Sequence, residues 1–181
     1  MIALARLVYY VAASEDGDIA GPNGDLDWLH RHETPEEDYG YAGFIAGIDG
    51  LVMGRATFEL SCSFGDWPYG DRPCWLLSHR APDGWHDLPA KVRVCQDTPE
   101  ALGAQWISLG LQRVWLVGGG AVAADFDAAG LIDEMVLTTV PVRLERGIGL
   151  FGARTAPRTG FDTLQTLAFP NGLVQRRMAR R

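Results

Sequence analysis

The chain has 181 residues, of which 47% are hydrophobic and 22% are charged, a composition typical of folded proteins and not of disordered ones. At about 150 residues per domain, this length predicts one domain spanning residues 1–181, with a sizeable core. Sixteen Lys and Arg against 23 Asp and Glu give a formal net charge of −7. Because nucleic-acid binders normally carry the opposite sign, we expect no nucleic-acid partner.

The sequence also argues against membrane association and metal binding. No apolar run approaches the about 20 residues that a membrane-spanning helix needs. Residues 1–10 lack the small-residue cleavage site of a secretory signal. Cys62, Cys74 and Cys95 are odd in number and lack C-x-x-C spacing, which predicts free thiols and no zinc site. We therefore expect a cytoplasmic protein that holds no metal ion.

Runs rich in β-branched, aromatic and aliphatic residues recur along the chain and predict strands. The predicted strands are 5–13, 50–54, 74–78, 92–95, 113–118, 134–142, 163–169 and 173–178. Leu51–Met53 and Val114–Val117 are wholly apolar, which favours central strands covered on both faces, as in a mostly parallel sheet. The Asn-Gly pair within Phe169–Gly172 predicts a tight turn between two antiparallel strands at the end of the chain.

Helix signals lie between these strands. Thr98–Glu100 predicts a helix start, with Leu102, Trp106 and Leu109 facing the core and Gly110 ending the helix. A further helix is expected directly after the glycines at 118–120. Strands that alternate with helices and end in a hairpin predict an α/β sheet with antiparallel strands at one edge.

An earlier helix is predicted from Thr34–Glu37, which has the pattern of a capping box. Tyr41 and Ile45 follow at helical spacing, and Asp38 lies on the same apolar stripe. An inward-pointing carboxylate is costly to bury and its pKa tends to rise, which makes Asp38 a candidate acid or substrate anchor. The alternative is an aspartate in the first turn that stabilises the helix dipole.

The strongest local signal for ligand binding is Val114–Val122, where a buried strand leads into three glycines and then an apparent helix. Glycines let a phosphate approach the backbone, and a helix N-terminus offers unpaired N–H groups. The segment predicts a diphosphate cradle, with a tight connection that binds no ligand as the alternative. It is not the G-x-G-x-x-G pattern, so it does not indicate a Rossmann fold.

A second strand also ends in a glycine, Gly54, with Arg55 and Thr57 close behind. Arg55 is suited to bidentate phosphate recognition, and Thr57 to capping the next helix or donating to a phosphate. A surface salt bridge is the alternative for Arg55. Because ligands gather beyond the carboxyl ends of strands in α/β sheets, we expect both glycine-ended strands to face one ligand.

The segment Ser14–Trp28 has the composition of a loop, yet it holds Ile19, Leu26 and Trp28. It is interpreted as a lid over a ligand, or as a connector folded onto the core.

Several of these segments occur in one characteristic order over nearly the whole chain: Ser14–Ala20, Gly21–Gly24, Leu26–Leu29, Met53–Glu59, Leu76–Ser78, Val117–Gly120 and Leu137–Val140. In this order the chain resembles the dihydrofolate reductase-like superfamily, especially the bacterial branch grouped with the reductase domain of bifunctional riboflavin-biosynthesis proteins. The resemblance implies a three-layer α/β fold, with a mostly parallel sheet of about eight strands, a C-terminal antiparallel hairpin and helices on both faces.

The resemblance also implies that NADPH is the cofactor. By matched motif, the expected cofactor-binding residues are Gly54, Arg55 and Thr57 at the phosphates, Ser78, His79 and Arg80 along the adenosine and its 2′-phosphate, Gly118, Gly119, Gly120, Ala121 and Val122 at the diphosphate, and Ala13, Ile19 and Ala20 beside the nicotinamide. The cofactor supplies the hydride, and the fold supplies position and water exclusion.

For the substrate, the resemblance singles out five residues. Asp38 lies fifteen residues before Met53, where dihydrofolate reductases carry their proton-donating carboxylate, and Arg72 falls where those enzymes bind the folate tail. Asp27 and Trp28 are expected to line the pocket, together with Thr138. Ala123 stands where those reductases have a Tyr, and the Asp-Pro and Leu-x-x-Arg stretch of the riboflavin branch is missing.

These observations predict a stand-alone, NADPH-dependent reductase of the riboflavin-biosynthesis type, which transfers hydride to a C=N or C=O bond of a small heterocycle. The alternatives are dihydrofolate reduction and a non-catalytic NADPH-binding protein. Because riboflavin-type relatives usually dimerise, we also expect a homodimer.

Overall fold

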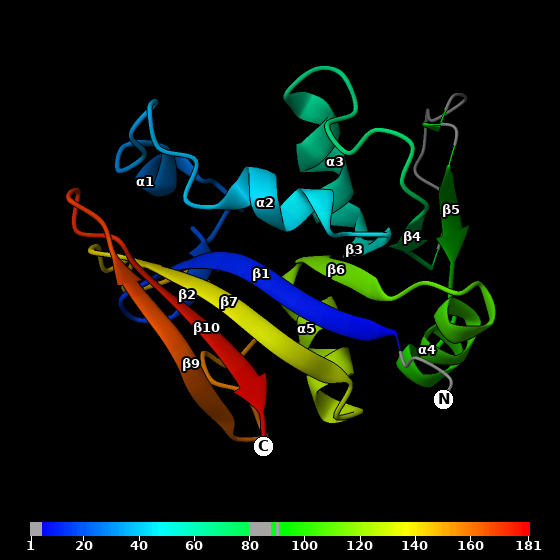
Figure 1. The fold of residues 1–181 in the computed structure, drawn as a ribbon. Helices are drawn as coiled ribbons and strands as arrows, with labels where there is room; N and C mark the ends of the chain where they lie inside the picture. Colours follow the sequence, from blue (N-terminus) through cyan, green and yellow to red (C-terminus); the bar gives the residue numbers. More distant parts are fainter. Residues whose placement is uncertain (1–4, 80–87, 90) are drawn as a thin grey trace.

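The structure is a computed structural model that describes residues 5–79, 88–89 and 91–181, and among these residues eight strands form one continuous sheet (Figure 1). Its strand order is β5-β4-β3-β6-β1-β7-β10-β9. In that order the strands are Val92–Cys95, Cys74–Leu77, Gly50–Gly54, Arg113–Gly118, Arg6–Ser14, Ile132–Val140, Val174–Arg180 and Phe161–Ala168. The first six are parallel, whereas β10 is antiparallel to both of its neighbours. The mostly parallel sheet with a C-terminal antiparallel hairpin is confirmed.

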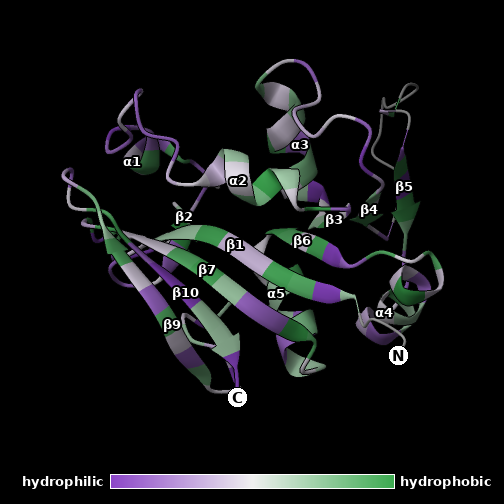
Figure 2. Ribbon diagram, in the orientation of Figure 1, coloured by the Kyte–Doolittle hydropathy of each residue, from purple (hydrophilic) through white to green (hydrophobic). Residues whose placement is uncertain are grey.

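Helices cover both faces of the sheet, as predicted. The longer helices are α2 (Tyr41–Ala46) and α3 (Arg55–Ser63) on one face, and α4 (Pro99–Ser108) and α5 (Gly120–Ala128) on the other (Figure 1). Side chains alternate along β1, so that Leu7 and Tyr9 pack with α4 and α5, whereas Val8 packs with α2 and α3. Figure 2 shows apolar residues along the central strands. A large core cluster packs on each face of these strands.

The predicted start and end of α4 are confirmed. The Thr98 hydroxyl accepts a hydrogen bond from the backbone N–H of Ala101 at 3.3 Å, and Pro99 occupies the first turn. Gly110 has the positive φ of 73° that follows a helix C-terminus. The expectation for Leu109 is wrong, because the helix ends at Ser108 and the Leu109 side chain is 56% exposed.

The predicted capping box at Thr34 is also wrong. The helix begins only at Tyr41, after Gly40 with a φ of 79°. The Thr34 hydroxyl instead accepts a hydrogen bond from Asn171 of the C-terminal turn at 3.2 Å, and the Thr34 N–H donates to the Tyr39 hydroxyl at 3.0 Å. A long-range contact thus uses the group that would have capped the helix.

Three short elements have no counterpart in the predicted set. They are β2 (Asp18–Ala20), α1 (Asp27–His30) and β8 (Ile148–Gly149). The two strands pair with each other in a separate antiparallel ribbon. Elements of two to four residues are too short to show hydrophobic periodicity, so the sequence pattern could not reveal them.

The C-terminal hairpin closes as predicted, through an Asn-Gly turn in which Gly172 has a φ of 88° and the Phe169 N–H donates to the Leu173 carbonyl at 2.9 Å. Strand β9 is the edge of the sheet and is almost wholly exposed. The expected homodimer stays a prediction. Among the described residues, no helix has the length and apolar character needed to cross a membrane.

Replacing Phe126 by Ala should lower the free energy of unfolding by about 3–5 kcal/mol. The ring is fully buried in α5 and stacks on Trp106 with centroids 5.8 Å apart, so its loss leaves a cavity between two helices and the sheet. Leu109→Ala is the control, because that exposed side chain should change stability by less than about 0.5 kcal/mol. Urea unfolding followed by circular dichroism measures both, and equal effects would contradict the assigned core.

Candidate functional site

Three adjoining hollows lie at the carboxyl ends of the parallel strands. The main cleft, of about 630 Å³, is formed by the ends of β3, β4, β5 and β6 and the starts of α3 and α5. The middle pocket, of about 650 Å³, shares Thr57, Gly119 and Ile148 with it. A third hollow, of about 430 Å³, is lined by Tyr10, Tyr39 and Tyr41 and is called the tyrosine pocket. It shares Tyr10 and Ala12 with the middle pocket. The three hollows therefore adjoin one another along this edge of the sheet.

Two helix N-termini face the main cleft. Gly54 precedes α3 and Gly119 precedes α5, and neither helix has a side-chain hydrogen bond at its N-cap. The first N–H groups of a helix have no partner within the helix, and the dipole makes that end positive. Since residues 54–57 and 119–122 line the same cleft, the two ends together offer an anion site. Gly118, with a φ of 146°, is the turn that leads into the second of them.

Close packing explains why glycines occupy this turn. A Cβ on Gly120 would lie 2.7 Å from the backbone nitrogen of Gly152, and nearer still to the Gly149 carbonyl oxygen. A Cβ on Gly118 would lie 3.3 Å from the Thr57 hydroxyl oxygen. The peptide bond between Gly118 and Gly119 is cis. The glycine-rich turn is therefore packed between α3 and the β8 turn, with its other side open to the cleft.

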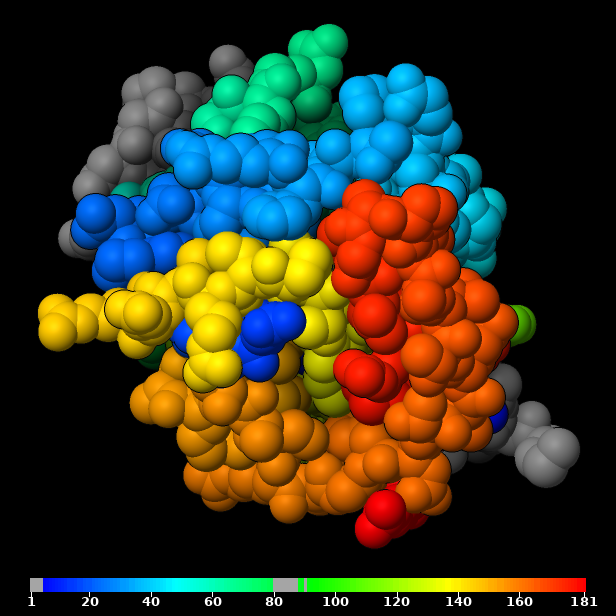
Figure 3. All heavy atoms as spheres, turned by 90° about the vertical axis from the view of Figure 1, so that its left-hand side faces the viewer, coloured from blue at the N-terminus to red at the C-terminus, as the bar shows by residue number. Residues whose placement is uncertain are grey.

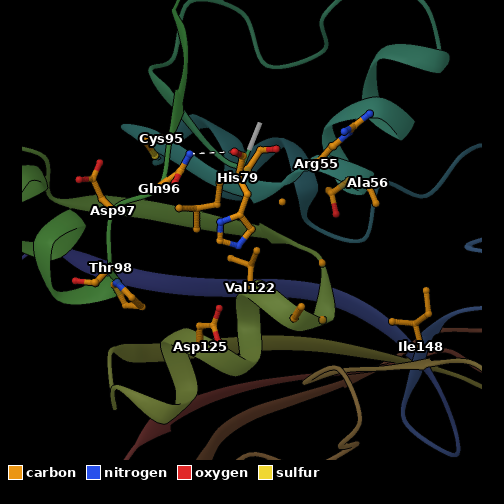
Figure 4. Close-up of a pocket in the computed structure, with 18 residues that line it drawn as sticks. Arg55, Ala56, His79, Cys95, Gln96, Asp97, Thr98, Val122, Asp125 and Ile148 are labelled. Carbon is orange, nitrogen blue, oxygen red and sulfur yellow. Dashed lines mark hydrogen bonds between the residues drawn. The ribbon is translucent and has the colours of Figure 1, made fainter. Parts of the chain in front are cut away.

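The predicted phosphate residue Arg55 makes the surface salt bridge that was its alternative role. Its Nε donates to the Glu59 carboxylate at 2.6 Å, and the side chain extends along α3 away from Val122 (Figure 4). Thr57 does not cap the helix, because α3 begins two residues earlier. Both residues still line the main cleft, so their expected roles toward a ligand stay predictions.

The far end of the main cleft is lined by the segments after β4 and β5. The His79 ring points into the cavity over Val122, and Gln96 donates a hydrogen bond to the His79 carbonyl at 3.1 Å (Figure 4). Ser78 lines the same end, whereas Arg80 lies outside the described residues. Sequence reasoning missed Gln96 and Asp97, although the rule applied to β3 and β6, that ligands gather beyond strand ends, would have found them after β5.

The middle pocket has mainly apolar walls. Ile19 and Ala20 of β2 line it, together with Trp115 and Val117 of β6, and their expected contact with the nicotinamide stays a prediction. Ala13 does not line it, because this alanine is 1% exposed and packs in the core on the other face of the sheet. The expected place of Ala13 beside a ligand stays a prediction.

The segment 14–20 is tied down by the loop that follows β7. The Asp16 carboxylate accepts hydrogen bonds from the backbone N–H groups of Leu144 and Glu145, at 3.1 and 2.9 Å. These bonds and that from the Ser14 hydroxyl lower the pKa of Asp16 to about 2. Figure 3 shows the two segments, blue and yellow, packed side by side. The first half of the predicted lid is thus held as a connector. Its second half lines the middle pocket at Asn23, Gly24 and Leu26.

Asp38 is not the buried carboxylate that the sequence predicted. It is exposed, and its oxygens accept the backbone N–H groups of Gly40 and Ala42 at 2.8 and 3.1 Å. These hydrogen bonds favour the charged form and lower the pKa of Asp38 below its ordinary value of 3.8. The residue lies at the rim of the tyrosine pocket as an ionised cap of α2, because the helix starts later than predicted.

Arg72 and Trp28, two further residues expected to bind substrate, lie away from the three hollows. Arg72 donates three hydrogen bonds to the carbonyls of Ile45, Ile48 and Tyr69, at 2.8 to 3.1 Å, so its guanidinium holds the end of α2. Trp28 is 6% exposed in a small core. Neither side chain lines the three hollows.

Of the two remaining residues expected to bind substrate, Thr138 lines one of the hollows and Asp27 does not. Asp27 is exposed, in the first turn of α1, and lines none of the three hollows. Thr138 lines the tyrosine pocket, 6% exposed, and its hydroxyl accepts a hydrogen bond from Gln175 at 3.1 Å.

This sheet, with a glycine turn and two helix N-termini at its carboxyl edge, defines a dihydrofolate reductase-like α/β protein. No family model matches the chain. The uncharacterized protein YwjB of Bacillus subtilis (strain 168) is 33% identical over 147 residues, which are 81% of this chain and 82% of YwjB. A putative riboflavin biosynthesis protein from Shewanella sp. PV-4 is 32% identical with a TM-score of 0.84, over 97% of this chain and 99% of that one.

The chain belongs to the family of these two proteins, within the riboflavin-biosynthesis-type branch of the dihydrofolate reductase-like superfamily. The resemblance noted in the sequence is confirmed. The fold is also that of the Thermotoga maritima diaminohydroxyphosphoribosylaminopyrimidine deaminase/5-amino-6-(5-phosphoribosylamino)uracil reductase. That chain is 14% identical with a TM-score of 0.70, over 98% of this chain and 57% of the other.

Gly120→Ala should destabilise the protein by about 1–3 kcal/mol, because the added methyl group meets backbone that cannot move freely. Gly103→Ala is the matched control, since a Cβ at this position in α4 meets nothing within 4 Å. Alanine is the better helix former, so the control should gain about 0.5–1 kcal/mol. Thermal unfolding compares the two variants, and a neutral Gly120→Ala would contradict the packing described.

Asp38→Ala should lower the midpoint of thermal unfolding at pH 7 more than Asp38→Asn, because asparagine keeps one oxygen that can cap α2. The folded-state pKa of Asp38 is lowered, so the stability from its charge is present at neutral pH and is lost as the pH falls below 3.8. The difference between wild type and Asp38→Asn should therefore shrink on acidification. Exposed Glu36, replaced by Gln, is the control, and no loss in Asp38→Ala would refute the capping role.

Proposed function

We propose that this protein is a reductase that binds a reduced nicotinamide cofactor, NADPH, in the main cleft and transfers its hydride to a small heterocycle in the adjoining pockets. The observation that carries the proposal is the pair of helix N-termini, α3 and α5, that face one cleft without side-chain caps. Such an arrangement suits the diphosphate of a dinucleotide. The family membership adds support, since one relative is described as a putative riboflavin biosynthesis protein.

The described residues that line the main cleft and the middle pocket suit a dinucleotide. Backbone N–H groups at 119–122 would hold the diphosphate, because the Gly118–Gly120 turn leaves the cleft side free of side chains. Ser78 and His79 would lie along the adenosine, and Ile19 and Ala20 would border the nicotinamide. When bound, the cofactor supplies the hydride. The apolar walls of the middle pocket exclude water from the place where the transfer occurs.

The alternative of dihydrofolate reduction was based on Asp38 and Arg72, and neither side chain is arranged for the role that this reaction would give it. Arg72 already donates to three carbonyls, so it does not present a guanidinium to a folate tail. Asp38 is an exposed, ionised cap and holds no proton to donate at neutral pH. The riboflavin-type assignment does not depend on either residue. A protein that binds the cofactor without turnover is the outcome to distinguish by experiment.

Titration of the purified protein with NADPH should quench tryptophan fluorescence saturably, because Trp115 lines the middle pocket. Ala121→Asp should weaken this binding about tenfold or more, since a carboxylate at the exposed second position of α5 repels the diphosphate. The same change favours the helix dipole, so the fold should stay intact. Ala121→Asn, equal in size but uncharged, is the matched control.

A parallel titration with NADH tests the choice of cofactor, and NADPH is expected to bind more tightly. Absence of saturable binding of both nucleotides to the wild type refutes the proposal. Equal binding by Ala121→Asp and Ala121→Asn would remove α5 from the diphosphate site.

A further inference from the structure

The tyrosine pocket has fixed aromatic walls. The Tyr10 ring stacks on Phe44 with centroids 4.2 Å apart, and its hydroxyl donates to the Tyr39 carbonyl at 3.2 Å. The Tyr39 hydroxyl in turn accepts a hydrogen bond from Asn171 at 2.6 Å. Tyr41 lies edge-on to Tyr10, with centroids 6.3 Å apart. These contacts hold three tyrosines around a cavity whose size suits one small ring system.

The charge around this pocket is negative. Glu33, Glu37 and Asp38 line it, and the described residues that line it include no lysine, arginine or histidine. Burial raises the pKa of Tyr41, and the positive charge of Arg72 partly opposes this rise. The N–H groups of Arg72, however, donate to backbone carbonyls. A cavity with one sign of charge attracts ligands of the other sign and repels those that share its own.

The carboxyl groups of the pocket lie at its exposed rim, and the other proton-bearing side chains among the described residues that line it are tyrosines and threonines. Asp38 has a lowered pKa and is ionised at neutral pH, and the carboxylates of Glu33 and Glu37 belong to exposed residues. Reduction of a neutral C=N or C=O bond needs a proton as well as a hydride. A substrate that already carries its positive charge on the nitrogen of a C=N bond does not.

We propose that the substrate is a planar ring with a cationic C=N⁺ bond and no phosphate group, bound between the three tyrosines with its charge toward Glu33, Glu37 and Asp38. This inference rests on the proposed reductase function. Aromatic faces and carboxylates both attract such a cation. Tyr10 and Ala12 line both this pocket and the middle pocket, so a ring seated here reaches the expected place of hydride transfer.

The step balances without any further reactant. A hydride forms a new C–H bond at the carbon of C=N⁺, and the π electron pair becomes the lone pair of nitrogen. The ring becomes a neutral amine, and the nicotinamide is oxidised by the loss of the hydride and its two electrons.

The same charge disfavours a phosphorylated substrate. The Thermotoga maritima relative of this fold is described as a phosphoribosylaminouracil reductase. A phosphate placed near three carboxylates would be repelled, since the described residues that line the pocket include no lysine, arginine or histidine to pair with it. The charge of the tyrosine pocket thus separates this protein from a reductase of that substrate.

Binding is tested with N-methylquinolinium, a planar C=N⁺ cation, against quinoline, which has a similar shape and no charge at pH 8. The cation should bind more tightly by fluorescence quenching. Replacing all three carboxylates (Glu33→Gln, Glu37→Gln and Asp38→Asn) should weaken its binding by about five- to tenfold, since exposed pairs are individually weak. Glu36→Gln, in the same loop but outside the pocket lining, should have no effect. Equal binding of cation and quinoline to the wild type overturns the inference.

Turnover is tested with N-methyl-3,4-dihydroisoquinolinium and NADPH, followed by the loss of reduced-nicotinamide absorbance and by mass detection of the amine product. The wild type should reduce the cation, and the triple variant should show a raised KM while binding NADPH as before. If NADPH binds but is oxidised only with a phosphorylated pyrimidine, the substrate inference fails and the reductase function stands. If no nicotinamide cofactor binds, the proposed function fails and this inference fails with it.

Discussion

The close approach between the start of α5 and the turn at Gly149–Gly152 is the contact on which the cleft depends. Gly120 has no side chain, so the backbone of this turn packs directly on the helix. The contact positions β8, and the pairing of β8 with Asp18 and Ala20 positions β2. Ile148 of β8 consequently lies where the main cleft meets the middle pocket. Backbone packing, more than side-chain charge, gives the proposed cofactor site its shape.

Charged side chains around the site make their hydrogen bonds to the protein itself. Arg55 pairs with Glu59, Arg72 holds the end of α2, and Asp38 caps its start. In the proposed cofactor site, the backbone N–H groups that the glycine turn leaves uncovered would therefore carry much of the anion recognition. Such backbone donors would let a protein with a net charge of −7 bind an anion.

The tyrosine pocket is assembled from distant parts of the chain. Asn171 of the last hairpin donates to the His32 carbonyl at 2.8 Å and to the Tyr39 hydroxyl, which fixes the loop that carries the carboxylates. Gln175 of β10 bonds the Tyr39 carbonyl and the Thr138 hydroxyl, both at 3.1 Å. The C-terminal hairpin thus supports the tyrosine pocket, whereas the helix N-termini border the main cleft.

The sequence by itself determined the class of fold and the edge of the sheet at which the site lies. Apolar runs such as Val114–Leu116 predict buried strands because a sheet covered on both faces hides them from water. Glycines marked two strand ends, where Gly118 has a positive φ and where Gly54 and Gly120 leave room for close packing. Only the tertiary structure decided which hydrogen bonds Thr34, Asp38 and Arg72 make. Thr34 bonds the C-terminal turn, and Arg72 bonds carbonyls at the end of α2. Asp38 bonds the start of α2, which begins later than predicted. Local patterns show which groups need a hydrogen bond, and only the folded chain chooses the partner.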